Sequence, residues 1–162
     1  MWKNVAITIL IIACAGIGYW GYQEKQEKEQ IAIQAENSYQ KAFNSLTYQV
    51  GLLNDKIGTT LAMNSRSSLS PALTEVWRIT SEAQNEVGML PLGLLPFNET
   101  EEFLSEIGNF SYQVAVRDLE KEPLSDDEYA VLENLYEKSD EIQSELRDVQ
   151  QKVIENNLKW ID

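Results

Sequence analysis

Ser38 and Lys41 are the first residues to weigh for chemistry, because they stand in the order Ser-x-x-Lys. In penicillin-binding enzymes this spacing places a lysine amine beside a serine nucleophile. The companion motifs of those enzymes do not occur in this sequence, and the residues around the pair have the apolar spacing of a continuous helix. We therefore interpret Ser38 and Lys41 as polar residues on a helix surface.

Carboxylates are the other reactive groups, and the sequence contains 26 Asp and Glu but no histidine. The commonest general base and metal ligand is therefore missing, and a Glu-x-x-His di-iron site cannot form. Asp126 to Glu128 lack the alternating ligands and glycine of a calcium loop, and they fit the first turn of a helix. Pairs such as Glu101 and Glu102 fit solvated helix faces. The sequence predicts no enzyme, no cofactor and no metal site.

The charge balance bears on the class of partner, since 13 basic residues leave a net charge of −13. Such a surface repels nucleic acid phosphates and anionic lipid headgroups, so no nucleic acid partner is expected. It attracts cations or a basic protein partner, or it serves solubility alone. Cys14 is the one cysteine, so an intramolecular disulfide cannot form.

Residues 5–22 contain no charged residue. As a helix they span about 27 Å, close to the roughly 30 Å of a bilayer core. Trp2 precedes the segment and aromatic residues close it, which is typical of headgroup interfaces. We predict a transmembrane anchor over residues 1–22, formed by Val5, Ile7, Ile9, Leu10, Ile11, Ile12, Ile17, Tyr19, Trp20 and Tyr22.

Three other interpretations of this segment are open. Ala13-Cys14-Ala15 has the form of a secretory cleavage site, Ile11 to Cys14 loosely fits a lipoprotein signal, and a buried soluble helix is the third. Apolar residues continue past Cys14 and the only basic side chain before the segment is Lys3, so the anchor is favoured. Lys25 and Lys28 stand on the other side among glutamates, which leaves the orientation open.

The pattern of residues 23–162 predicts an all-α domain, an acidic antiparallel bundle of about four helices. The first and last helices are expected to be long. The first runs from about Gln23 to Met63 and continues the membrane helix without a break. Its apolar positions are spaced by threes and fours. They are Ala35, Tyr39, Ala42, Leu46, Val50, Leu53, Ile57 and Leu61.

The second and third helices are shorter. The second begins with Ser70 as cap and Pro71 at its first position. Its predicted inward residues are Leu73, Val76, Trp77, Thr80, Ala83, Val87 and Leu90. The third follows Asn98, with Glu101 completing a capping box, and is ended by Glu122-Pro123. Its predicted inward residues are Leu104, Ile107, Phe110 and Val114.

The fourth helix has a capping box of Ser125 and Glu128, with Leu124 and Tyr129 at hydrophobic-staple positions. A heptad seam then continues for about four repeats. Its members are Leu132, Leu135, Ser139, Ile142, Leu146, Val149, Val153, Asn156 and Trp160. The polar members fix register or face solvent. The seam packs within the bundle or pairs between chains, which would make a homo-oligomer.

A proline-bounded apolar loop lies between the second and third helices. Leu92, Leu94, Leu95 and Phe97 are its large apolar side chains after Leu90. They either pack under the end of the bundle or form a docking patch for a partner.

Four segments resemble the YpeB family of germination proteins of endospore-forming bacteria. They are residues 19–24 (YWGYQE), 46–65 (LTYQVGLLNDKIGTTLAMNS), 69–88 (LSPALTEVWRITSEAQNEVG) and 95–129, and the similarity covers essentially the whole chain. The resemblance implies a membrane segment and a helical domain. The family's C-terminal PepSY repeats are missing here, and with the helical pattern running to residue 162 this suggests a protein cut from something longer.

The resemblance also implies a function in germination. Proteins of this family are needed for the cortex-lytic enzyme SleB to be present and stable in spores, and are thought to restrain it. The implied location is the inner spore membrane, with the soluble domain on its outer, cortex-facing side. The family supplies no catalytic residues to transfer. The alternatives are a self-assembling structural bundle or a sensor bundle of the cell envelope.

Overall fold

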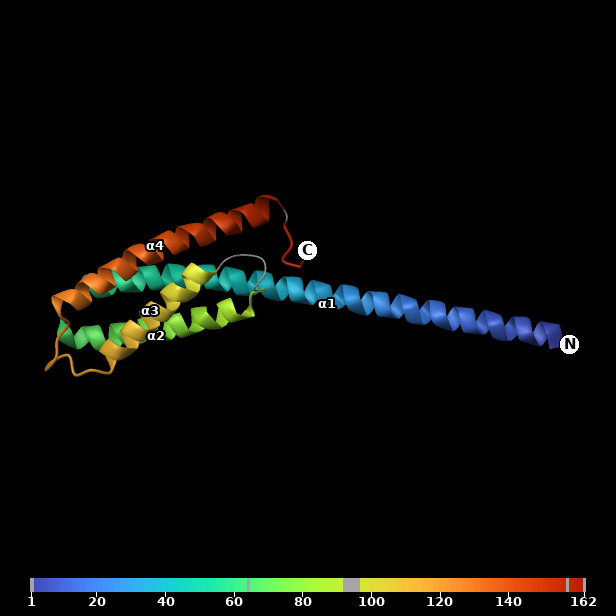
Figure 1. Ribbon diagram of the computed structural model, residues 1–162, viewed down its shortest axis with the longest axis horizontal. Helices are drawn as coiled ribbons and strands as arrows, with labels where there is room; N and C mark the ends of the chain where they lie inside the picture. Colours follow the sequence, from blue (N-terminus) through green and yellow to red (C-terminus); the bar gives the residue numbers. More distant parts are fainter. Residues whose placement is uncertain (1, 64, 92–96, 157, 162) are drawn as a thin grey trace. The chain divides into compact units, whose positions relative to one another are not determined.

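A computed structural model describes the backbone of residues 2–63, 65–91, 97–156 and 158–161, and their side chains except those of residues 2–18 and 66. Within these ranges the chain forms four α-helices and no strand: α1 (Trp2–Leu61), α2 (Arg66–Met89), α3 (Asn98–Ala115) and α4 (Asp126–Glu155) (Figure 1). The predicted all-α class is confirmed, as are the unbroken first helix and the greater length of α1 and α4. The chain divides into two compact units, residues 1–37 with residue 161, and residues 38–160 with residue 162.

The first unit is helical backbone whose described side chains begin at Tyr19. Tyr19, Trp20 and Tyr22 are exposed, and Lys28 Nζ lies 2.9 Å from Glu24 Oε1, one helical turn away. Such exposed pairs stabilise a helix by only a few tenths of a kcal/mol. The predicted anchor side chains from Val5 to Ile17 lie outside the described side chains. Among the helices that are described, none combines the length and hydropathy of a membrane span.

The second unit is built around one main core to which all four helices contribute. The buried residues of this core are Ala42, Phe43, Leu46, Val50, Leu53 and Ile57 of α1, Val76, Ile79, Ala83 and Val87 of α2, Phe103, Leu104 and Ile107 of α3, and Leu132, Leu135, Ile142 and Leu146 of α4, with Leu90 and Trp160. The apolar residues predicted at spacings of three and four along these helices thus face a common interior. Burying such side chains is the main stabilising contribution, roughly 1.5–3 kcal/mol for each large one.

A smaller cluster closes the end of the bundle at which α2 and α4 begin. Its buried members are Leu69, Leu73, Val114, Leu119 and Leu124, with Tyr129 packed against them. Leu124 and Tyr129 occupy the predicted staple positions, and the structure places both in this cluster. The cluster explains where the connecting segments must run, because Leu69, Leu119 and Leu124 all come from the chain just outside or at the ends of the predicted helices.

The α1 and α4 helices pack antiparallel in a regular register. Gln150 Nε2 donates to Asn44 Oδ1 at 2.7 Å, and one heptad further along α1 a Cβ on Gly51 would lie 2.6 Å from Gln143 Nε2. After another heptad, a Cβ on Gly58 would lie 2.9 Å from Tyr136 Cε2. Each step of seven residues forward on α1 is a step of seven backward on α4. The two glycines therefore leave room for side chains of α4 to lie against the backbone of α1.

A buried polar layer fixes this register. Asn54 Nδ2 donates to Ser139 Oγ at 2.9 Å, and Ser139 Oγ donates to the backbone carbonyl of Tyr136 at 2.6 Å. A slip of the helices would leave these buried groups without partners, at a cost of about 1–3 kcal/mol. This hydrogen bond explains why Ser139, a polar residue, interrupts the apolar seam of α4, and it matches the predicted role of fixing register.

The predicted start of the second helix at Pro71 is wrong. The helix α2 begins at Arg66, Ser65 is its N-cap without a side-chain hydrogen bond, and Pro71 lies inside it. Leu69 is buried in the smaller cluster, and the extra turn places it there. Ser70, the predicted cap, instead donates from Oγ to the carbonyl of Ala115 at 2.7 Å, which satisfies one of the free carbonyls at the end of α3.

Both predicted ends of the third helix are also wrong. Phe97 is the N-cap of α3 and no side chain caps it, so Asn98 does not form the predicted capping box. The helix ends at Ala115 rather than at Glu122, because the chain turns to bury Leu119. Glu122 N donates to Asp118 O at 2.8 Å within this turn.

The start of α4 matches the prediction and its end does not. Glu128 N donates to Ser125 Oγ at 3.2 Å and Ser125 N donates to Glu128 Oε2 at 2.8 Å, which is the predicted capping box. The helix ends at Glu155, where Leu158 N donates to Val153 O at 3.1 Å and the chain turns. Trp160 is therefore not a seam residue on the helix. Its ring packs 4.9 Å from that of Phe43 and is buried in the main core.

Candidate interaction surface

The predicted docking loop is only partly described. Leu92, Leu94 and Leu95 lie outside the described residues. Phe97 is half-buried, and its ring centroid lies 6.4 Å from that of Phe43 in the main core. Phe97 therefore packs against the bundle, which is the first of the two alternatives for this loop. A docking role for the other three residues stays a prediction.

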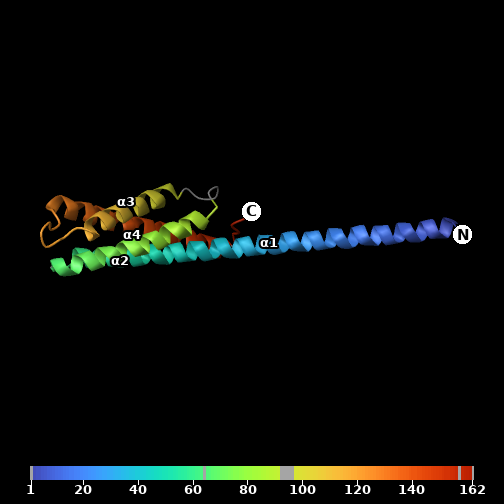
Figure 2. The ribbon, with the colours of Figure 1, turned by 90° about the horizontal axis from the view of Figure 1, so that it is seen from below.

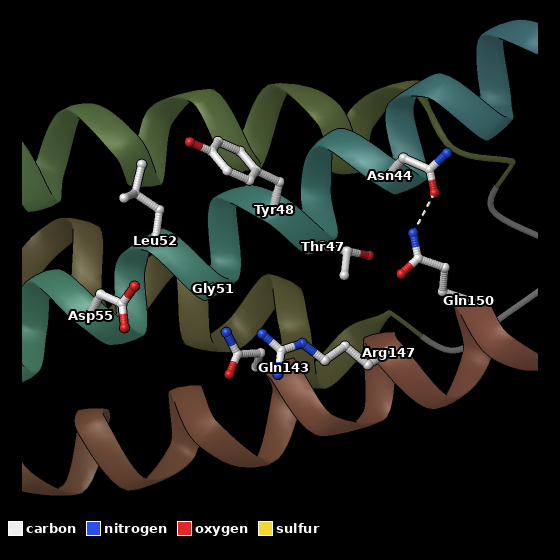
Figure 3. Close-up of a pocket in the computed structure, with 9 residues that line it drawn as sticks. All are labelled: Asn44, Thr47, Tyr48, Gly51, Leu52, Asp55, Gln143, Arg147 and Gln150. Carbon is white, nitrogen blue, oxygen red and sulfur yellow. Dashed lines mark hydrogen bonds between the residues drawn. The ribbon is translucent and has the colours of Figure 1, made fainter.

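A groove of about 480 Å³ lies between α1 and α4 (Figure 3). The groove is open at Gly51, because this residue has no side chain to fill the space between the two helices. Thr47 donates its hydroxyl to Phe43 O at 2.9 Å, so its polar atom is held against its own helix. The lining residues are Asn44, Thr47, Tyr48, Gly51, Leu52 and Asp55 of α1, and Gln143, Arg147 and Gln150 of α4.

The lining of this groove is rich in side chains that form hydrogen bonds. It offers side-chain amides, one carboxylate in Asp55 and one guanidinium in Arg147. Gln150 and Asn44 already bond to each other. No serine, cysteine or histidine lines it as a nucleophile or base. Elsewhere in the described part of the chain, no group of three or more His, Cys, Asp or Glu side chains is placed to hold a metal ion.

A second surface lies over the α2–α3 pair and was missed in the sequence, where Trp77 was predicted to point inward. The structure leaves Trp77 42% exposed, and its ring centroid lies 5.9 Å from that of Tyr112, which is 54% exposed. Ile79, absent from the predicted stripe, is the buried residue instead. A helical projection of the sequence would have shown this difference. Val76, Thr80 and Ala83 share one face of the helix, and Ile79 lies closer to that face than Trp77 does.

The described charges of α2 lie away from Trp77. Glu82 accepts a hydrogen bond from Gln49 Nε2 at 3.0 Å and Glu86 accepts one from Ser45 Oγ at 3.0 Å, both across to α1. Arg78 bonds to Glu75 and Glu82 on its own helix. The face of α2 turned toward α1 is thus the charged one, and the face turned toward α3 is not.

An ion pair joins Arg117 to Glu128. Arg117 donates from both terminal nitrogens to the two carboxylate oxygens of Glu128, at 2.8 and 2.9 Å. This pair, more than the hydrogen bond from Ser125 N, lowers the pKa of Glu128 to about 2, and Glu128 raises the pKa of Arg117. The pair joins the chain after α3 to the first turn of α4, so its role is structural.

Comparison with known proteins gives a consistent result. The family model described as YpeB N-terminal matches residues 27–162. Proteins named sporulation protein YpeB align with the whole chain at 59% identity in Bacillus subtilis (strain 168), 52% in Oceanobacillus iheyensis and 46% in Halalkalibacterium halodurans. The chain spans 36% of the length of each of these relatives. No solved structure matches it.

Proposed function

We propose, from the premise that this chain belongs to the YpeB family, that it is a non-catalytic, membrane-anchored module that localises, stabilises or restrains the cortex-lytic enzyme SleB. Membership in the family implies a role in spore germination. The observation that carries the proposal is the family match across residues 27–162, which includes every helix of the second unit.

The organisation of the second unit supports a binding role. Its core is continuous across four helices, and the Asn54–Ser139 layer holds α1 and α4 in one register. A scaffold of this kind presents fixed side chains on its outer faces, which lowers the conformational entropy lost when a partner binds. The exposed faces, rather than an enclosed cavity, are where such a module makes contact.

Anchoring rests on residues 5–22. The backbone of α1 runs without a break from Trp2 through this segment, and Tyr19, Trp20 and Tyr22 at its end are exposed. Aromatic rings at this position suit the headgroup region of a bilayer. The proposed location is the inner spore membrane, with residues 38–160 on the cortex-facing side, where the enzyme's substrate lies.

The net charge of −13 supports a basic partner. Complementary charge raises the rate of association, and its effect weakens as salt screens it. A complex that depends on this charge loses affinity as ionic strength rises.

A spore-forming strain that lacks its own YpeB tests the proposal. The chain is expressed in that strain, SleB is detected by immunoblot in dormant spores, and the chain is located by membrane fractionation. We expect SleB to be retained and the chain to be in the membrane fraction. Loss of SleB, as in the strain without any YpeB, would contradict the proposal, and a strain with the full-length relative is the positive control.

The paired substitution Ile9→Arg and Ile12→Arg separates anchoring from binding. Each arginine costs about 2.5–3.5 kcal/mol in the middle of a membrane helix, so the variant should leave the membrane fraction. The matched control changes Ile31 and Ile33, which are exposed outside the proposed span, to Arg. If both variants fractionate alike, the anchor is not residues 5–22.

The alternative of self-assembly through the α4 seam gains no support from the fold. Leu132, Leu135, Ile142 and Leu146 are buried within their own chain. Pairing through these residues would require α4 to leave the core. Sedimentation of the chain over a range of concentrations tests this alternative, and the envelope sensor stays a prediction as well.

A further inference from the structure

The α2 and α3 helices lie side by side and antiparallel (Figure 2). Trp77 contacts Tyr112, a Cβ on Gly108 would lie 3.2 Å from Thr80 Cγ2, and Gln84 Nε2 donates to Leu104 O at 3.3 Å. Residue numbers rise on α2 as they fall on α3. The two helices are thus close enough for their outward rows to form one surface.

Two rows of side chains make up that surface. On α2 the row steps by four and three, and on α3 by three and four, which keeps each row on one helix face. We call this surface the α2–α3 strip and define it by Trp77, Ser81, Gln84, Ser105, Gly108 and Tyr112. All are exposed except Gly108, which is half-buried.

The strip contains no charged residue, although 24% of the chain is charged. The Trp77–Tyr112 pair forms one end of the strip, and Val116, one turn beyond Tyr112, is also exposed. The cores of protein interfaces are depleted in charge and enriched in aromatic residues, and Trp and Tyr are the commonest hot-spot residues. The α1–α4 groove has the opposite composition, with Asp55 and Arg147 in its lining.

Acidic residues border the other end of the strip. Glu101 and Glu102 lie about one helical turn before Ser105, and both are exposed. On α2 the charges of Glu75, Arg78 and Glu82 lie away from the strip, on the side of the helix turned toward α1. A second copy of this chain would bring two acidic borders together, and an anionic membrane surface would be repelled. A protein with basic residues around its contact would be attracted.

We infer that the α2–α3 strip is the docking surface for a protein partner whose contact has an apolar anchor at one end and Lys and Arg residues at the other. The anchor packs on Trp77 and Tyr112, and the basic residues lie against Glu101 and Glu102. This inference rests on the proposed function, in which the chain binds a protein, and it adds the surface used and the chemistry of the partner.

The test uses the full chain in detergent and the purified cortex-lytic enzyme of the proposed function. Affinity is measured for the wild type, for Trp77→Ser with Tyr112→Ser, and for Ile154→Ser, an apolar control on α4 that is 70% exposed. We expect at least a tenfold loss for the paired variant and less than a twofold change for the control. Circular dichroism confirms that each variant is folded.

A charge-reversal variant tests the border independently. Glu101→Lys with Glu102→Lys should weaken binding severalfold at low salt and should reduce its dependence on salt. If the wild type binds and the aromatic variant binds equally well, the strip is not the docking surface while the proposed function stands. If the wild type does not bind at all, the proposed function itself fails and the inference fails with it. If the aromatic variant instead abolishes self-association of the chain, a second copy covers the strip and the inference is overturned.

Discussion

The α1–α4 pair and the α2–α3 pair of the second unit are both antiparallel, yet different kinds of side-chain contact join them. Between α1 and α4, Asn54 and Ser139 bond inside the core, and Tyr136 lies against Gly58. Between α2 and α3, the tilted rings of Trp77 and Tyr112 pack against each other on the outside. The first pair uses these side chains to fix its own register.

The second pair leaves its aromatic rings available for contact with another molecule. A helix pair that serves only the fold would be expected to bury a tryptophan or replace it with a charged residue. The difference therefore separates a part of the bundle that stabilises it from a part suited to binding. Four sets of substitutions break or sharpen this comparison.

The largest difference should come from replacing one aromatic residue in each region. Phe43→Ala removes a fully buried ring that contacts Phe97 and Trp160, and should lower the free energy of unfolding by about 3–5 kcal/mol. Trp77→Ala should lower it less, because that side chain is 42% exposed and its loss returns less apolar surface to water. Urea unfolding followed by circular dichroism measures both. Equal losses would mean that Trp77 serves the fold.

The buried polar layer should give the next effect. Ser139→Ala leaves the Asn54 amide buried without its acceptor and should cost about 1–3 kcal/mol. Replacing both residues, Asn54→Leu with Ser139→Ala, removes the unsatisfied amide, so its cost should be smaller than the sum of the two single changes. Strict additivity in this double-mutant cycle would show that the hydrogen bond contributes nothing.

The Arg117–Glu128 pair should make a smaller, pH-dependent contribution. Since the pKa of Glu128 is lowered to about 2 in the folded chain, its stabilisation is complete above the unfolded pKa of about 4.3 and is lost as pH falls toward 2. Glu128→Gln should cost about 1–2 kcal/mol at pH 7, since the pair is partly exposed. The gap between the two unfolding curves should close from pH 4.5 to pH 2.

Glu133→Gln on the exposed face of α4 is the control for this titration. It should show no comparable gap at any pH. A gap for Glu128→Gln that persists unchanged at pH 2 would assign the effect to the capping hydrogen bonds rather than to the ion pair.

The two glycines of α1 should give the smallest effects, and they should differ. Alanine raises helix propensity by about 0.5–1 kcal/mol over glycine. At Gly51 the new Cβ meets only the flexible end of Gln143, so Gly51→Ala should be neutral or stabilising. At Gly58 it meets the ring of Tyr136, so Gly58→Ala should be less stable than Gly51→Ala. Thermal unfolding compares them, and the reverse order would contradict the described register.

Local signals in the sequence predicted part of this fold well. The capping box of Ser125 and Glu128 depends on residues three apart, and it forms as predicted. The spacing of Leu46, Val50 and Leu53 likewise predicted a buried face of one continuous helix. These features need only the geometry of one helix, which the sequence contains.

Features set by contacts between distant residues were not predictable in the same way. Pro71 favoured a helix start, but burial of Leu69 extends α2 by a further turn. Trp160 continued the heptad spacing, yet the chain turns after Glu155 and its ring packs on Phe43. The exposed contact of Trp77 with Tyr112 depends on which faces α2 and α3 turn toward each other. No local pattern connects these two residues, which lie 35 positions apart in the chain.

Oxidative footprinting of the full chain, alone and with the purified cortex-lytic enzyme, tests the central claim most directly. The method reports the solvent exposure of individual aromatic side chains, and Trp77, Tyr112 and Tyr48 are all exposed in the free chain. Our account predicts that the enzyme protects Trp77 and Tyr112 and leaves Tyr48, in the α1–α4 groove, unchanged. Protection of Tyr48 with Trp77 and Tyr112 still fully reactive would contradict it.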